Sequence, residues 1–318
     1  MGTRRLVAAV AALLVCGCAE TPPQPVPSPT ATATATASTA APLDPDHLPH
    51  AFTINGALLD GRNARLVQRV LTKVADGLPA LKLDMTASTM TLTVLDGHRA
   101  IGYRWMNGTV DETTTDFQYF GQDTFDPEDF PLESVGTMFD VADLLGVQGK
   151  LVYQVQQYRE QQVVQTVASQ PESLTVFFRD DASAVPVLDV RTTADIAEGL
   201  ASVVEDADAV VEFGFSAQRG YWARVPVEDG RELRTRKGGI PTFAVPDGGP
   251  ADAPTFDPAL IRPATIATAL ATRRSGEDDD CEVRVDAADG TPAMTIRCGG
   301  TTTRTDLAGK ALPKRPGG

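Results

Sequence analysis

The sequence predicts an α+β protein made of two related lobes, each an antiparallel sheet with helices packed against one face. Strand-like runs joined by tight-turn dipeptides alternate with segments of helical apolar spacing. The same order of elements occurs twice along the chain. The body of roughly 265 residues suffices for two domains of common size. We therefore expect a first lobe over residues 46–190 and a second over residues 191–312.

The first lobe is expected to open with a helix over residues 63–75, where apolar side chains recur at helical spacing. Asp96-Gly97 and Asn107-Gly108 then mark hairpin turns, because type I′ turns prefer these dipeptides. The strands that these turns and the preceding loops connect are predicted over residues 81–85, 89–95, 98–106 and 109–119.

A second helix is expected after Phe125-Asp126-Pro127. Asp126 is expected to cap a helix start, since an aspartate accepts from the first free N–H groups and proline fits the first helical position. The predicted helical face consists of Val135, Met138, Phe139, Ala142 and Leu145. Strands over residues 151–158 and 162–168 and a hairpin over residues 174–189 complete the lobe.

The second lobe repeats this order, which predicts an internal duplication. A helix over residues 193–204 precedes strands over residues 209–216, 220–227 and 231–237, with a turn at Asp229-Gly230. Phe256-Asp257-Pro258 then opens another helix, and a hairpin follows over residues 282–297. In this alignment the strands at 151–158 and 162–168 are an extra pair in the first lobe.

The two cysteines of the folded part are expected to form a disulfide. Cys281 and Cys298 lie at equal distances in sequence from the Asp289-Gly290 turn, so they face each other across the predicted hairpin. In an exported protein such a bond persists, and closing a loop of this length stabilises by roughly 3 kcal/mol. Two cysteines without a nearby histidine make a zinc site improbable.

Export is predicted from the first eighteen residues. Arg4 and Arg5 precede the apolar run 6–15, which is too short for a lasting membrane helix, and Gly17 stands before Cys18. These residues resemble the lipobox of bacterial lipoproteins. The resemblance implies that residues 1–17 are a signal peptide and that Cys18 begins the mature chain and carries the acyl chains, such as palmitate.

The predicted localisation is therefore the extracytoplasmic face of the cell membrane, through a lipid anchor. Cys16 is the poorer lipidation candidate because the bulky Val15 precedes it. The alternatives are an ordinary secretory signal with two unrelated cysteines, or a retained helix. No later apolar run approaches the length of a membrane-spanning helix.

Composition predicts that residues 18–45 are a disordered tether, because this Pro/Thr/Ala-rich segment buries too little apolar surface to offset chain ordering. The basic, Pro/Gly-rich residues 313–318 are expected to fray. The net charge of −14 argues against nucleic acid and against electrostatic binding to anionic lipid surfaces.

Motifs for catalysis are missing from the sequence. It holds no G-x-S-x-G, H-E-x-x-H, P-loop or G-x-G-x-x-G pattern. Two segments are candidates for a metal site. The segment 44–50 holds two of the three histidines, but its prolines keep the backbone irregular. The acidic run 277–280 lacks the ligand spacing of a calcium loop. An acid/base pair among the many carboxylates stays open. We expect no enzyme, no cofactor and no metal.

The aromatic residues on the predicted strands are expected to be core or cross-strand pairs rather than a ligand wall. They are Tyr103, Trp105, Phe117, Tyr119 and Phe120 in the first lobe, and Tyr221 and Trp222 in the second.

The segment FDPALIRPATIATALA, with the lipobox and the strand-rich body, is remotely similar to the LprG/LppX lipid-carrier lipoproteins of mycobacteria. That resemblance implies a half-open antiparallel sheet that holds acylated lipid against helices; this chain is longer, duplicated and carries a cysteine pair. We expect a non-catalytic lipoprotein that binds a protein or cell-envelope partner. The alternative is a carrier of an apolar ligand between sheet and helices.

Overall fold

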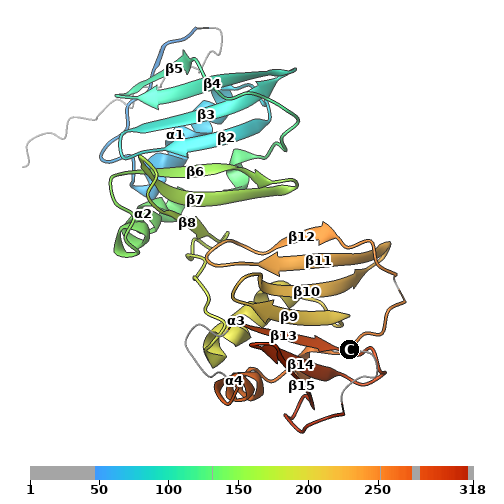
Figure 1. Cartoon of the computed structure of the whole chain (residues 1–318). Coiled ribbons are helices and arrows are strands. Elements are labelled where there is room, and N and C mark those ends of the chain that lie inside the picture. Colours follow the sequence, from blue (N-terminus) through green and yellow to red (C-terminus); the bar gives the residue numbers. More distant parts are fainter. Residues whose placement is uncertain (1–46, 131, 251, 274–279, 314–318) are drawn as a thin grey trace, which may run out of the picture. The chain divides into compact units, whose positions relative to one another are not determined.

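The computed structural model describes residues 47–130, 132–250, 252–273 and 280–313. Within these ranges the chain forms two antiparallel sheets, of eight and seven strands, and four α-helices (Figure 1). The predicted α+β class is thereby confirmed. Of the helices in these ranges, none is both long and apolar enough to cross a membrane.

The first sheet has the strand order β1-β5-β4-β3-β2-β6-β7-β8. Its helices are α1 (Gly61–Val74) and α2 (Val135–Leu144). Its strands are β1 (His50–Ala51), β2 (Ala80–Met85), β3 (Thr89–Asp96), β4 (Arg99–Met106), β5 (Thr109–Thr113), β6 (Lys150–Arg159), β7 (Gln162–Gln170) and β8 (Thr175–Phe178).

The second sheet has the strand order β12-β11-β10-β9-β13-β14-β15. Its helices are α3 (Thr193–Val204) and α4 (Pro263–Ala271). Its strands are β9 (Glu212–Ser216), β10 (Gly220–Val227), β11 (Gly230–Arg236), β12 (Phe243–Pro246), β13 (Cys281–Asp286), β14 (Ala293–Cys298) and β15 (Thr301–Asp306).

The two sheets have the same order of strands: the series from β5 to β8 in the first sheet matches the series from β12 to β15 in the second. In this order β6 and β7 occupy the places of β13 and β14, so the expectation of an extra strand pair in the first lobe is wrong. The predicted hairpin over residues 174–189 is likewise corrected to the single strand β8 and an isolated bridge from Phe178 to Ala184. β15 holds in the second sheet the place that β8 holds in the first, but it carries no apolar residue, so its apolar pattern could not reveal this equivalence.

The two Phe-Asp-Pro segments hold equivalent places. Phe125 bridges to Ala80 and Phe256 bridges to Val210, each just before or at the start of a central strand. Asp126 and Asp257 cap as predicted, each accepting from a backbone N–H two residues on. They cap short 3₁₀ turns, however, and α2 and α4 begin several residues later.

Each sheet has its own core of alternating side chains. Val67 and Leu71 of α1 cluster with Leu83 of β2 and Leu92 of β3, all at most 1 % exposed. In the second sheet the corresponding cluster joins Ile196 of α3 with residues of β9, β10 and β13. Successive strand residues point to opposite faces. The alternate residues of the second sheet therefore face away from this core, on what we call the open face.

Candidate functional site

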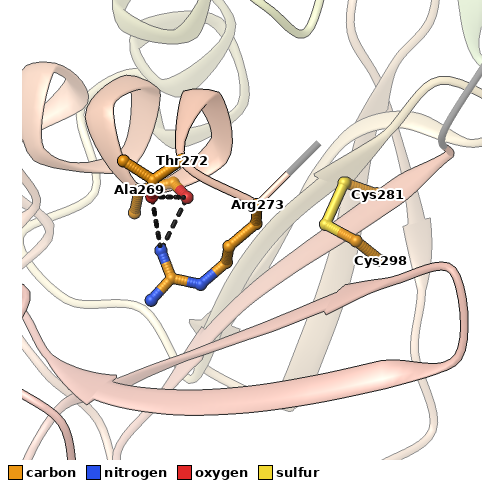
Figure 2. Close-up of a disulfide and its surroundings, with 5 residues drawn as sticks. All are labelled: Ala269, Thr272, Arg273, Cys281 and Cys298. Carbon is orange, nitrogen blue, oxygen red and sulfur yellow. Dashed lines mark hydrogen bonds between the residues drawn. A yellow bond between two sulfur atoms is a disulfide. The ribbon is translucent and has the colours of Figure 1, made fainter. Parts of the chain in front are cut away.

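The predicted disulfide is present. Cys281 and Cys298 are directly opposed at the ends of β13 and β14, with Cα atoms 4.3 Å apart (Figure 2). Both side chains belong to the second core and are at most 7 % exposed. Nearby, the Arg273 guanidinium donates to the carbonyl of Ala269 at 2.6 Å and so satisfies the C-terminal end of α4. The disulfide is therefore a buried link between two strands of the core, and we assign it a structural role.

The other sequence-predicted positions lie apart from this bond. Cys18 falls outside the described residues, as do residues 44–46 of the segment 44–50 and residues 277–279 of the acidic run. His98 is exposed in the β3–β4 turn. Among the described residues, no group of histidine, cysteine and carboxylate side chains is arranged to hold a metal ion.

The open face of the second sheet holds a buried carboxylate that sequence reasoning missed. Glu212 is 3 % exposed. Its Oε1 accepts from the Trp222 indole at 2.8 Å, and its Oε2 pairs with Arg224 at 2.6 Å and Arg284 at 2.8 Å. Three donors from β10 and β13 thus converge on one side chain of β9. Such charge-assisted bonds are the strong ones, and they fix the geometry of the face.

A second carboxylate extends the cluster. Asp247, which follows β12, accepts from Arg224 Nε at 3.1 Å and pairs with Arg231 Nη2 at 2.7 Å. Burial lowers the pKa of Arg224, but the Glu212 and Asp247 carboxylates outweigh burial and raise it overall. The guanidinium of Arg224 is therefore shared between two acids and stays charged.

Trp222 lies on the same open face and not in the core. Its ring covers Gly214, where an added Cβ would lie 2.3 Å from the indole Cζ2 atom. The Arg219 guanidinium lies over the ring, 4.0 Å from its centroid, and the indole is 1 % exposed. Burial, followed by the Arg224 charge, lowers the pKa of Arg219. The expectation that Trp222 is a packed residue holds, yet its neighbours are arginines.

The first sheet lacks this cluster at the matching places. Its corresponding open-face positions, aligned by strand order and register, are Lys82, Thr91, Thr93 and Gln154. There Gln154 donates to Asp84 at 2.7 Å, and Lys82 pairs with Asp84 at 3.0 Å. At these positions the first sheet therefore has one amide hydrogen bond and one ion pair, whereas the second sheet has several guanidinium groups.

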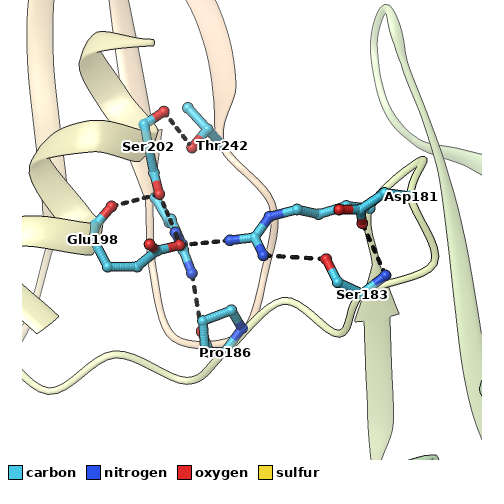
Figure 3. Close-up of polar contacts among 8 residues, drawn as sticks. Asp181, Ser183, Pro186, Glu198, Ser202 and Thr242 are labelled. Atoms are coloured by element: carbon cyan, nitrogen blue, oxygen red, sulfur yellow. Dashed lines mark hydrogen bonds and ion pairs between the residues drawn. The ribbon is translucent and has the colours of Figure 1, made fainter. Parts of the chain in front are cut away.

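A further polar cluster lies at β11, α3 and the residues after β8 (Figure 3). Glu198 of α3 accepts from Arg179 at 2.5 Å and from Arg236 at 3.2 Å. Arg236 is 2 % exposed and also donates to Ser202 and to the carbonyl of Pro186. Burial lowers the pKa of Arg236, and Glu198 opposes that shift. A cavity of about 420 Å³ borders this cluster.

That cavity is mixed in character. Valine and phenylalanine side chains form part of its wall, and the acidic side chains of Asp180 and Glu205 offset the charges of Arg179 and Arg236. Because the guanidinium groups of both arginines are bonded to Glu198, the cluster fixes the segment after β8 to α3. We read it as structural.

The comparisons with known proteins are sparse. No protein-family description and no curated protein matches the chain. Two solved structures of the Helicobacter pylori β clamp are similar over 80 % of this chain, one bound to a DNA ligase peptide and one to 5-chloroisatin. The identities are 12 % and 10 %, the matches span 67 % and 63 % of those chains, and the TM-scores are 0.16 and 0.14. At such TM-scores the likeness carries no argument about fold or function.

Proposed function

We propose that this chain is a lipid-anchored extracytoplasmic lipoprotein that binds a protein or cell-envelope partner and catalyses no reaction. Residues 1–17 act as the signal, Cys18 carries the lipid, and residues 18–45 form the tether. Two lobes, 46–190 and 191–312, arose by duplication, and helices pack on one face of each sheet. The shared strand order and the paired Phe-Asp-Pro segments support the duplication.

The open face of the second sheet is the proposed partner-binding surface. The observation that carries this proposal is the Glu212 cluster, in which three donors hold one buried carboxylate and so fix the surrounding arginines. Arginine and tryptophan are enriched where protein interfaces derive most of their binding energy. A surface ordered before binding also loses less entropy on association.

A carrier of apolar ligands would need room between the helices and the sheet. In the first sheet that layer holds Leu71, Leu83 and Leu92, each at most 1 % exposed and in one cluster. The burial of these side chains in one cluster favours the binding hypothesis over the carrier hypothesis. Native mass spectrometry of the purified protein before and after solvent extraction checks this, because an extractable lipid mass would reverse the preference.

The binding surface is tested by crosslinking on intact cells. A photoreactive residue at Thr295, which faces the open side opposite Arg284, should capture a partner. The matched control places the same residue at Arg62 of α1, whose side chain is 90 % exposed. Equal capture at both positions, or capture at neither, contradicts the assignment of this face.

The anchor is tested separately through Cys18. Cys18→Ala should move the protein from the detergent phase to the aqueous phase, and the mature protein should lose the mass of its acyl chains. A Cys18→Ala protein that keeps the mass of the acyl chains would contradict lipidation at this residue.

A further inference from the structure

We propose that the open face of the second sheet recognises an acidic segment of a partner protein, whose carboxylates bind Arg219 and Arg284. The inference rests on the proposed function, because it names the partner's chemistry at the same face. Four observations lead to it: the uncommitted guanidinium of Arg219, the exposed edge of Arg284, the sign of the exposed charge, and neighbouring apolar side chains.

Arg219 is a charged donor without a carboxylate partner among the residues the structure describes. Its guanidinium lies over the Trp222 ring, 4.0 Å from the ring centroid, and the ring itself is held by a hydrogen bond to Glu212. Stacking on an aromatic face leaves the in-plane N–H groups of an arginine free to donate. The fork of Arg219 is thus oriented in advance for a carboxylate.

Arg284 presents a second guanidinium to the same side of the sheet. It pairs with Glu212 and with Asp286 at 3.3 Å, yet its side chain remains 48 % exposed. Trp222 and Arg284 both lie opposite Gly214, on the strands either side of β9. Neighbouring strands are about 4.8 Å apart, so the two guanidinium groups are within reach of one short peptide segment.

The exposed charge of this face is basic, although the whole chain carries −14. Glu212 and Asp247 are buried in ion pairs and neutralised by arginines. On β10, β13, β14 and the β9–β10 loop, the exposed charged residues of this side are Arg219, Arg284 and Arg297 and one acid, Glu282, which lies opposite Arg297. In a chain of net negative charge, such a basic patch is a place where an acidic segment would be attracted.

Apolar side chains next to the arginines favour a protein partner over a membrane or a polymer. Leu233 is opposite Arg224 on the open face, and Val245 is opposite Leu233 and is 41 % exposed. Arginine beside apolar residues is typical of a protein–protein interface, and Arg clusters are a common means of reading acidic motifs.

The experiment uses the full chain with Cys18→Ala and an octaglutamate peptide as the probe, measured by isothermal titration calorimetry at low salt. We expect binding that weakens as salt rises, because charge pairs at a surface are screened. Arg219→Ala should weaken the affinity at least about tenfold, since hydrogen bonds to charged groups are worth roughly 1.5–3 kcal/mol each. Arg219→Lys should recover only part of this, because an ammonium group lacks the planar fork.

Arg62→Ala is the matched control: it removes the same charge from an exposed site on α1 and should leave the affinity unchanged. Unchanged binding by Arg219→Ala, or no peptide binding at all, overturns the inference. Tighter binding to anionic phosphatidylglycerol vesicles than to the peptide overturns the choice of a protein partner. If crosslinking at Thr295 captures a partner without an acidic segment, the proposed function stands and this inference fails.

Discussion

Removing the Glu212 carboxylate is the most direct test of how the open face is held together. Glu212→Ala leaves the Trp222 indole without its acceptor and deprives Arg224 and Arg284 of their shared oxygen. Breaking a buried pair on one side costs about 3–5 kcal/mol. Here Arg224 and Arg284 are 25 % and 48 % exposed and retain Asp247 and Asp286, so we expect the lower end, about 3 kcal/mol.

The assay is urea unfolding of the full chain, followed by tryptophan fluorescence and by circular dichroism. Glu212→Gln should cost less than Glu212→Ala, because an amide oxygen can still accept from Trp222. The control is Glu282→Ala, an exposed carboxylate on β13 of the same sheet, which should stay within about 0.5 kcal/mol of the parent. If Glu212→Ala also stays within that margin, the cluster does not organise this face and the reasoning fails.

Three further outcomes follow from the described packing. Replacing Cys281 and Cys298 together by serine should lower the free energy of unfolding by roughly 3 kcal/mol, as measured against the oxidised parent in urea. Gly214→Ala should displace the Trp222 ring and cost about 1–3 kcal/mol, with a red-shifted emission as the check. Burial raises the pKa of Tyr153, so the folded state keeps a proton that the unfolded state loses above about pH 10. The free energy of unfolding should therefore fall as pH rises beyond that value, and alkaline titration at 295 nm should show Tyr153 ionising only with unfolding.

Local patterns in the sequence predicted the helices and the hairpin registers well. The helix over residues 193–204 matches α3, and Asn107-Gly108 forms the two-residue turn between β4 and β5 with both φ angles positive. The register that opposes Cys281 to Cys298 is also confirmed, although the loop between β13 and β14 is longer than the expected two residues. These features depend on neighbours in sequence, which is why propensity and turn chemistry sufficed.

Elements without an apolar pattern were missed or misplaced. β15 reads TTTRTD and forms an edge strand, where pairing with β14 supplies the backbone hydrogen bonds and little side-chain burial is needed. Leu145 shows the converse error, because it fits a helical face by spacing yet is 54 % exposed. Apolar spacing identifies a helix better than it identifies which side chains the core covers.

The Glu212 cluster had only one weak local signal in the sequence. Its members come from β9, β10, β11, β13 and the residue after β12, so only the strand order brings them together. In the sequence Glu212 stands among apolar residues of a buried strand, which looks like an error of patterning. A lone carboxylate at such a position is the one hint available, since a buried charge requires partners.

The two sheets differ in the residues on their open faces, and this difference bears on the role of the Glu212 cluster. Both sheets have the same strand order. If the open faces served folding alone, we would expect similar residues on both. The first sheet meets them with Gln154, Lys82 and Asp84, whose contacts leave no buried carboxylate. The second carries Glu212 with several arginines, an arrangement that is expensive to bury and no more stabilising than a simpler face. This cost has a purpose where the fixed arginines serve recognition, and we therefore infer that the open face of the second sheet, rather than that of the first, is the binding surface.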